Sequence, residues 1–175
     1  MKKTKAYENF PIWIVLIYIF ISISLYFVGF YLLYLIWSWL ILPYLIYILY
    51  IEFKIYKEGC IGCYYYGKMC GGGRGKLAKL LFKKGSPNIW RNKKVSFKDF
   101  IPSLFISIIP IAAGIFLLIK DFNWLILVFA AWPIIIWFFG NPLIYGELIC
   151  PNCKQAQICC PVCEYFMKKA MKKQK

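Results

Sequence analysis

The chain contains no histidine among its 175 residues. A Cys₂His₂ zinc site, a Ser-His-Asp or Cys-His catalytic group and a histidine-ligated haem each need that side chain, so all of them are excluded. Acidic residues are also scarce, because 7 Asp and Glu stand against 22 Lys and Arg. The net charge of +15 makes the placement of the basic residues informative about how the chain is organised.

Charged side chains of either sign are missing from three long stretches. These are the 43 residues of 9–51, the 20 of 100–119 and the 25 of 122–146. Spanning a bilayer takes about 20 apolar residues, so the first stretch is long enough for two helices and each of the others for one. The first stretch is also far longer than the apolar region of a cleaved signal peptide, which is about 7–15 residues. The sequence therefore predicts an all-α polytopic membrane protein with four transmembrane helices arranged as two hairpins.

The basic residues indicate which side of the membrane the loops occupy. Residues 1–8 carry +2, residues 52–100 carry +9 and residues 147–175 carry +4, whereas the turn at 120–123 is neutral. Four spans place all three basic segments on one side, and Lys and Arg accumulate on the cytoplasmic side of membrane proteins. We therefore expect a multi-pass protein of the cell membrane with both termini and all of its cysteines facing the cytoplasm.

Hydropathy and charge together divide the chain into segments. Gly29 is the expected turn of the first hairpin, and the triplet Gly140-Asn141-Pro142 is expected to end the fourth helix. No charged residue lies inside a predicted span, which argues against a pump or a proton-coupled carrier. The expected segments are a first hairpin at 1–51 (helices near 11–28 and 31–51), a basic cysteine loop at 52–99, a second hairpin at 100–146 (helices near 100–119 and 124–140) and a cysteine-rich tail at 147–175.

All of the cysteines lie in the predicted loop and tail. Thiolate is a soft ligand that favours zinc and iron–sulfur clusters, and disulfides are rare in the cytoplasm. Three C-x-x-C pairs occur, and such a pair aims two sulfurs at one ion across a tight turn. The sequence therefore predicts metal or thiol chemistry, with these eight candidate ligands: Cys60, Cys63, Cys70, Cys150, Cys153, Cys159, Cys160 and Cys163.

Eight thiolates suffice for two four-ligand sites, and the spacing suggests one assignment. The tail pairs Cys150/Cys153 and Cys160/Cys163 can close one site across a short loop. The loop cysteines Cys60, Cys63 and Cys70 then lack a fourth ligand, which Cys159 is placed to supply. This pairing predicts up to two zinc ions and a loop that is joined to the tail, although swapped assignments remain open.

Two functions from different classes fit this composition. The first is an interaction or scaffolding role at the membrane surface, with zinc holding the loop and tail together and a protein partner as a possible binder. The second is a membrane redox protein that uses an iron–sulfur cluster or reactive C-x-x-C thiols. Whether the chain is an enzyme is left open by the sequence.

The loop sequence also indicates what the loop contacts. Residues 76–84 place leucines on one helical face and lysines on the other, as in a short helix lying on anionic lipid headgroups, and the C-terminal lysines predict the same contact. The run 71–76, GGGRGK, is not a phosphate loop, because Leu77 stands where Ser or Thr is needed and no strand precedes it. Membrane topology already accounts for the basic residues, which disfavours nucleic acid as a partner. The lysines expected on the lipid are Lys76, Lys79, Lys83 and Lys84.

Overall fold

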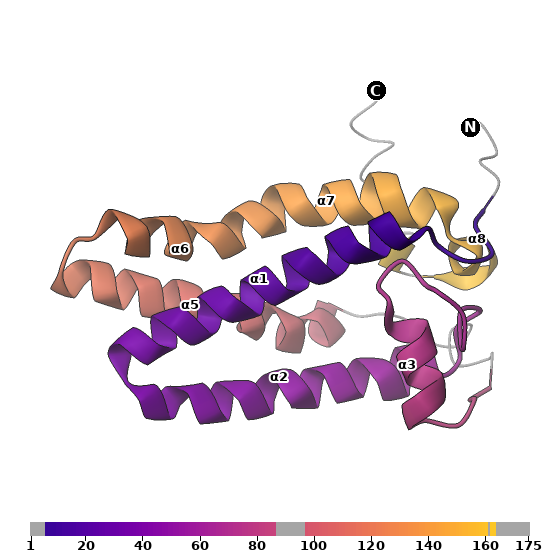
Figure 1. The fold of residues 1–175 in the computed structure, drawn as a ribbon, viewed down its shortest axis with the longest axis horizontal. Coiled ribbons are helices and arrows are strands. Elements are labelled where there is room, and N and C mark those ends of the chain that lie inside the picture. Colours follow the sequence, from indigo (N-terminus) through magenta and orange to yellow (C-terminus); the bar gives the residue numbers. More distant parts are fainter. Residues whose placement is uncertain (1–5, 87–96, 161, 164–175) are drawn as a thin grey trace. The chain divides into compact units, whose positions relative to one another are not determined.

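A computed structural model describes residues 6–86, 97–160 and 162–163, without the side chains of 97–100 and 159 (Figure 1). The described part is helical, with no strand beyond one isolated bridge between Tyr7 and Cys153. It contains four helices that are long and apolar enough to cross a membrane: Ile12–Ile36, Ser38–Cys60, Ile101–Lys120 and Trp124–Asn152. The expected helical class and number of candidate spans are therefore confirmed.

The chain divides into two compact units, which we describe separately. Unit 1 comprises Met1–Ile19, Lys54–Val95 and Asn141–Lys175, and unit 2 comprises Phe20–Phe53 and Ser96–Gly140. Unit 2 holds most of the apolar helical sequence. The described cysteines all belong to unit 1.

The turn between the first two helices comes later in the sequence than expected. Helix α1 runs over Ile12–Ile36 and α2 over Ile41–Ile55, separated by a 3₁₀ turn at Ser38–Leu40. The turn expected at Gly29 is thus wrong, and the chain reverses after Trp37, whose backbone is extended. Gly29 lies inside α1, where a Cβ would fall 2.7 Å from ring carbons of Tyr44. The glycine therefore allows two helices to approach closely instead of forming a loop.

The core of unit 2 draws on all four long helices. Tyr44 is 3% exposed, and its hydroxyl donates to the carbonyl oxygen of Ile106 at 2.9 Å. Ile106 lies four residues before Pro110, which has no N–H to offer that carbonyl, so the tyrosine satisfies a group that the proline leaves open. The buried residues of this core are Val28, Leu32, Leu33, Tyr44, Ile48, Ala113 and Ile126.

The second pair of long helices packs through small residues. Helix α5 spans Phe97–Lys120, and α6 spans Trp124–Ile135 with the Asn123 side chain accepting from the Leu125 N–H as its cap. A Cβ at Gly114 would lie 2.5 Å from the Cβ of Ala130. The two helices therefore come as close as their backbones permit, which is typical of helix pairs in membranes.

The fourth candidate span continues past the expected break. After α6 the chain is π-helical at Ile136–Gly140, α-helical at Asn141–Leu143 (α7), π-helical at Ile144–Ile149 and 3₁₀ at Cys150–Asn152. The wider π turns on both sides of Pro142 absorb a residue that would interrupt a regular α-helix. The expectation that the helix ends at Gly140 is therefore wrong.

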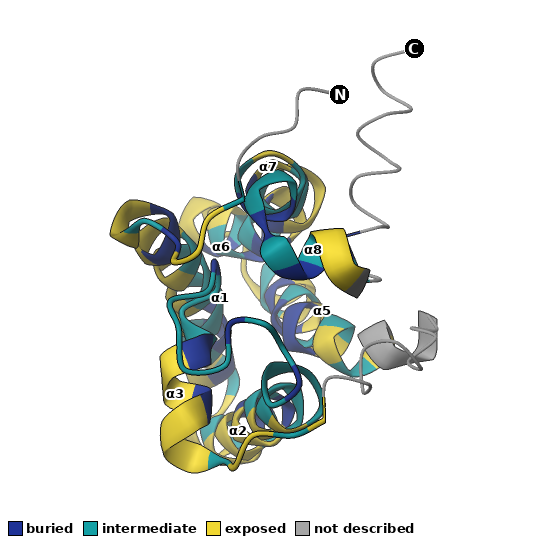
Figure 2. Ribbon diagram, turned by 90° about the vertical axis from the view of Figure 1, so that its right-hand side faces the viewer, coloured by how far each residue is buried: buried dark blue, intermediate teal, exposed yellow. Residues whose placement is uncertain are grey.

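Two features of the candidate spans bear on a membrane setting. Figure 2 shows exposed residues along the long helices. Large apolar side chains are among them, such as Phe20 at 72% and Ile119 at 81%, as suits helices that face lipid. The helices also extend beyond the uncharged stretches, so Glu52 falls within the span Ser38–Cys60 and accepts a hydrogen bond from the Tyr26 hydroxyl at 2.8 Å. Lys54, Lys57 and Glu58 fall within the same span, Lys120 ends the span Ile101–Lys120, and Glu147 lies within Trp124–Asn152. The expectation that no charged residue lies in a span is therefore wrong for the spans as the structure bounds them.

Candidate functional site

Three distant segments of the chain meet in unit 1. The N-terminal segment pairs with the tail, because the Tyr7 N–H donates to the carbonyl oxygen of Asn152 at 2.9 Å. It also pairs with the loop, because the Phe10 N–H donates to the carbonyl oxygen of Met69 at 3.0 Å. The loop and the tail are therefore parts of one compact unit, although they are separated by two membrane-length helices in the sequence.

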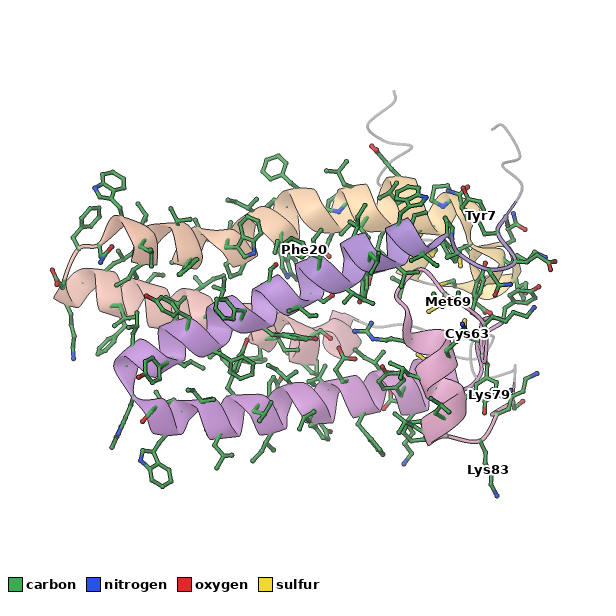
Figure 3. The ribbon with its side chains drawn as sticks, in the orientation of Figure 1. Tyr7, Phe20, Cys63, Met69, Lys79 and Lys83 are labelled. Carbon is green, nitrogen blue, oxygen red and sulfur yellow. A yellow bond between two sulfur atoms is a disulfide. The ribbon has the colours of Figure 1, made fainter. Side chains whose placement is uncertain are left out.

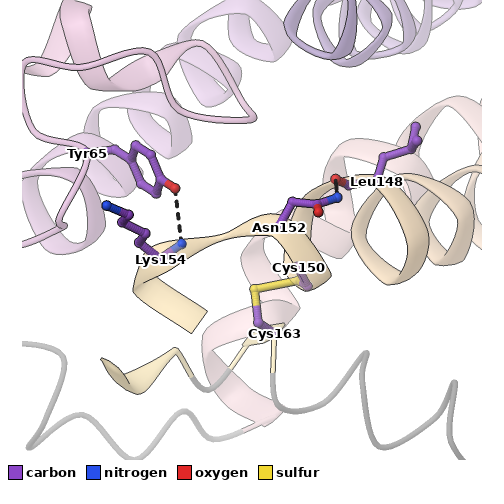
Figure 4. Close-up of a disulfide and its surroundings, with 6 residues drawn as sticks. All are labelled: Tyr65, Leu148, Cys150, Asn152, Lys154 and Cys163. Atoms are coloured by element: carbon purple, nitrogen blue, oxygen red, sulfur yellow. Dashed lines mark hydrogen bonds between the residues drawn. A yellow bond between two sulfur atoms is a disulfide. The ribbon is translucent and has the colours of Figure 1, made fainter. Parts of the chain in front are cut away.

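Tyr65 stands at the centre of this meeting point and is 1% exposed. Its hydroxyl donates to the carbonyl oxygen of Tyr7 at 2.6 Å. It also accepts from the N–H of Lys154 at 3.0 Å, a bond that Figure 4 shows. Its ring packs against Phe10, with the centroids 5.4 Å apart. One buried side chain thus connects the N-terminal segment, the loop and the tail.

The glycine-rich run shapes the loop around Cys70. The chain turns here because the Gly73 N–H donates to the Cys70 carbonyl oxygen and Gly73 takes a φ of 73°, which favours glycine. Helix α3, Arg74–Leu81, follows directly. A Cβ at Gly75 would lie 2.2 Å from the Tyr65 carbonyl oxygen, so only glycine permits this approach. Its N–H points at the Cys70 sulfur, 3.3 Å away.

The structure resolves the predicted cysteines into a disulfide and a set of thiols. Cys150 and Cys163 form a disulfide (Figure 4). Thiols outside this bond belong to Cys60, Cys63, Cys70, Cys153 and Cys160. Cys60 ends the π-helical segment Tyr56–Cys60, and Cys63 lies in the turns that follow (Figure 3). The Cys159 side chain lies outside the described residues.

Cys63 and Cys153 are brought together by the residues that follow each of them. The Tyr64 N–H donates to Oε1 of Gln155 at 2.8 Å, and Tyr65 bonds to Lys154 as described above. Residues 64–65 are therefore bonded to residues 154–155, directly after one cysteine of the loop and one of the tail. Gln155 is 5% exposed, which makes it a buried polar connection between the two segments.

Burial and neighbouring thiols determine the electrostatics of Cys63. Burial, with a smaller contribution from the nearby sulfurs of Cys153, Cys70 and Cys60, raises the pKa of its thiol to about 12. The backbone N–H of Tyr65 donates to the Cys63 sulfur and acts in the opposite direction. Cys60, Cys70 and Cys153 thus lie within electrostatic reach of Cys63.

Cys153 has a similar environment from the tail side. Burial raises the pKa of its thiol, while the N–H groups of Ala156 and Gln155 lower it by donating to the sulfur. Cys160 and Cys70 are close enough to raise the pKa as well. Hydrogen bonds to sulfur are what tune thiolate ligands in metal sites, so these amides suit a sulfur that carries negative charge.

The sulfurs of the described cysteines are not arranged as a coordination sphere. Among the described residues, no group of three or more Cys, Asp or Glu side chains is arranged so that it could hold a metal ion. The expected tail site of Cys150, Cys153, Cys160 and Cys163 is replaced by the Cys150–Cys163 disulfide, because those two sulfurs bond to each other. Cys153 of the tail lies within electrostatic reach of Cys63 and Cys70. The expected fourth ligand, Cys159, has its side chain outside the described part of the chain, so its assignment stays a prediction.

A polar rim borders the cysteines on the outside. Lys154 pairs with Glu8, and it holds the pKa of that exposed carboxyl below its usual range by hydrogen bonding and by its charge. Lys68 and Lys154 both donate to the Tyr64 hydroxyl, at 3.2 and 3.3 Å, and lower its pKa. Sequence reasoning missed Tyr64, Tyr65 and Gln155, for which the only available signal was a run of three tyrosines directly after a C-x-x-C pair.

The sequence matches no protein-family model, and no curated protein or solved structure shows a significant similarity to it.

Proposed function

We propose that the chain is an integral membrane protein in which a cysteine-ligated zinc ion joins the loop to the tail, forming a module for interaction or scaffolding at the membrane surface. The ligands proposed are Cys60, Cys63, Cys70 and Cys153. The observation that carries the proposal is the hydrogen-bonded meeting of residues 64–65 with residues 154–155, which brings one loop C-x-x-C pair beside a tail cysteine.

The chemistry of the four sulfurs supports this choice. Structural zinc sites are commonly formed by four cysteines, and zinc needs them as thiolates. Backbone N–H groups already point at three of these sulfurs, those of Cys63, Cys70 and Cys153. A divalent cation reverses the penalty that crowding and burial impose on a thiolate, and its binding free energy would draw the sulfurs into a tetrahedron.

The charge distribution supports a cytoplasmic orientation for this module. Residues 1–8, 52–100 and 147–175 hold the excess of Lys and Arg, and they supply unit 1, whereas the 120–123 turn is neutral. A reducing cytoplasm keeps thiols available to a metal. Labelling of intact cells with an impermeant maleimide should therefore leave the cysteines unmodified until the membrane is opened, and strong labelling from outside would reverse the orientation.

Metal analysis of the anaerobically purified protein, together with its visible absorption spectrum, tests the metal site. We expect one zinc ion per chain with no visible colour, and up to two ions if the Cys150–Cys163 bond is reduced and its sulfurs also coordinate. The matched variants are Cys153→Ser, which should lose the loop zinc, and Cys159→Ser, which should retain it. Loss in Cys159→Ser with retention in Cys153→Ser would show that the fourth ligand is Cys159, and absence of metal from the wild-type protein would refute the site.

A redox role is the second candidate, and the disulfide favours it. The Cys150–Cys163 bond lies in the same unit as the thiols of Cys153 and Cys160. A dithiol substrate would reduce this bond by giving two electrons and two protons, leaving as a disulfide while Cys150 and Cys163 become thiols. Metal-free protein whose Cys150–Cys163 bond is reduced by an added dithiol and reformed by an added disulfide oxidant, which takes up the two electrons and two protons, in repeated cycles would support this role. Brown protein with iron and sulfide would support the iron–sulfur version.

A further inference from the structure

Helix α3 turns its small residues inward and its leucines outward. Gly75 and Ala78 are buried against the loop. Leu77, Leu80 and Leu81 are 48%, 81% and 64% exposed. The exposed leucines give this eight-residue helix an apolar face. Such a face indicates that another apolar phase covers it.

The contacts of α3 within unit 1 show where this face lies relative to the candidate spans. At the start of the helix, Nη1 of Arg74 donates to the hydroxyl of Tyr18 at 2.8 Å, and Tyr18 belongs to α1. Just beyond its end, the ring of Phe82 stacks on Tyr56, with the centroids 6.4 Å apart. Tyr56 begins the last, π-helical turn of the candidate span Ser38–Cys60. Helix α3 is therefore held beside the second turn of α1 and the last turn of the span Ser38–Cys60, near one end of each of two helices that are suited to cross a membrane.

The cations around this face are exposed and have no acidic residue near them in sequence. Lys76, Lys79, Lys83 and Lys84 are all exposed, and residues 59–86 contain no Asp or Glu. Figure 3 shows the Lys83 side chain extending away from the ribbon. Apolar and cationic groups thus occur together on one short segment next to the span ends, which complements a surface of acyl chains below negatively charged headgroups.

We propose that α3 lies in the interface of the membrane that its own chain spans, with its leucines among the upper acyl chains and its lysines on anionic phospholipid headgroups. The position beside two span ends favours lipid over a soluble protein partner, because any bilayer around those spans ends at the level of α3. The charge of the segment selects anionic over zwitterionic headgroups. The proposal needs the chain to span a membrane, but it does not depend on the metal site.

Photo-crosslinking of the full chain in nanodiscs tests the contact directly. The probe, p-benzoylphenylalanine, replaces Leu80 in bilayers that contain equal amounts of phosphatidylglycerol and phosphatidylcholine, and mass spectrometry identifies the adducts. We expect lipid adducts that are enriched in phosphatidylglycerol by about fivefold. This ratio corresponds to the attraction that a single lysine contributes near a negatively charged surface. The enrichment should disappear in the triple variant Lys76→Gln, Lys79→Gln, Lys83→Gln and should weaken at high salt.

The same probe at Leu45, in the interior of α2, is the matched control, because it should crosslink both lipids in their bulk ratio. Adducts at residue 45 without adducts at residue 80 would overturn the proposal. An adduct between two copies of the chain at residue 80 would assign the face to a dimer, and equal capture of both lipids at residue 80 would remove the anionic selectivity. If the Leu80 variant does not fold, the probe at Leu77 gives the same reading.

Discussion

Replacing Gly75 by alanine tests how closely α3 must approach the cysteine loop. The added Cβ would lie 2.2 Å from the carbonyl oxygen of Tyr65 and 2.4 Å from that of Lys68. Real Cβ atoms essentially never come within 3.0 Å of such neighbours, which leaves a shortfall of 0.8 Å from 2.2 Å. Both oxygens belong to the backbone, so no side-chain rotation relieves the clash, and α3 must move away from the loop.

That movement has several energetic consequences. Overpacking of this kind costs about 1–3 kcal/mol. It also strains two hydrogen bonds, from the Gly75 N–H to the Cys70 sulfur and from the Gly67 N–H to the Gly75 carbonyl oxygen, each worth about 0.5–1.5 kcal/mol. Alanine's better helix propensity returns about 1 kcal/mol. We expect a net destabilisation of unit 1 of about 2–4 kcal/mol, combining these costs and the gain.

Hydrogen exchange of the full chain in nanodiscs measures this effect locally. Since about 1.4 kcal/mol corresponds to a factor of ten, amides of residues 64–81 should exchange roughly thirtyfold to several hundredfold faster in Gly75→Ala. Gly146→Ala is the matched control in the same unit, because nothing lies within 4 Å of its added Cβ. Its exchange should stay close to that of the wild type. Unchanged exchange of 64–81 in Gly75→Ala would refute the close approach of α3 to the loop.

Two further substitutions test the packing, one in each unit. Tyr65→Phe removes the hydroxyl that joins Tyr7 to Lys154, so we expect a loss of about 1–3 kcal/mol that appears as faster exchange of residues 151–156, and unchanged exchange would contradict its connecting role. Gly114→Ala pushes α5 away from Ala130 and should lower the thermal unfolding midpoint in detergent, at a cost of about 1–3 kcal/mol. Ala112→Leu adds more volume at an exposed position of the same helix and should leave the midpoint unchanged.

The number and class of the long helices could be predicted from the sequence. The absence of charge over 9–51, 100–119 and 122–146 is a property of composition alone, and length then gives the number of helices that fit. The described part of the chain contains four such helices. Their ends were harder to predict, because a helix continues past its apolar run wherever its polar residues find partners. Glu52 does so through Tyr26, and it therefore falls within a span.

Glycine and proline misled the prediction of breaks for a related reason. Gly29 was read as a turn, yet it makes room for the Tyr44 ring. The triplet Gly140-Asn141-Pro142 predicts a helix end, yet π-helical turns on both sides of Pro142 carry the helix through it. In each case the residue type is compatible with two structures, and a packing partner far away in the sequence decides between them. Local sequence cannot identify that partner.

The same distinction applies to the cysteines. The C-x-x-C spacing indicates thiol or metal chemistry, because a tight turn aims two sulfurs three positions apart at one point whatever the fold. Which pairs meet depends on contacts that leave no cysteine pattern, above all the buried Gln155 that accepts from the Tyr64 N–H. This bond joins Tyr64, the residue after Cys63, to Gln155, which lies two residues after Cys153 in the sequence. A glutamine and a tyrosine thus bring Cys153 beside the loop pair, whereas the spacing assigns Cys153 to the tail site.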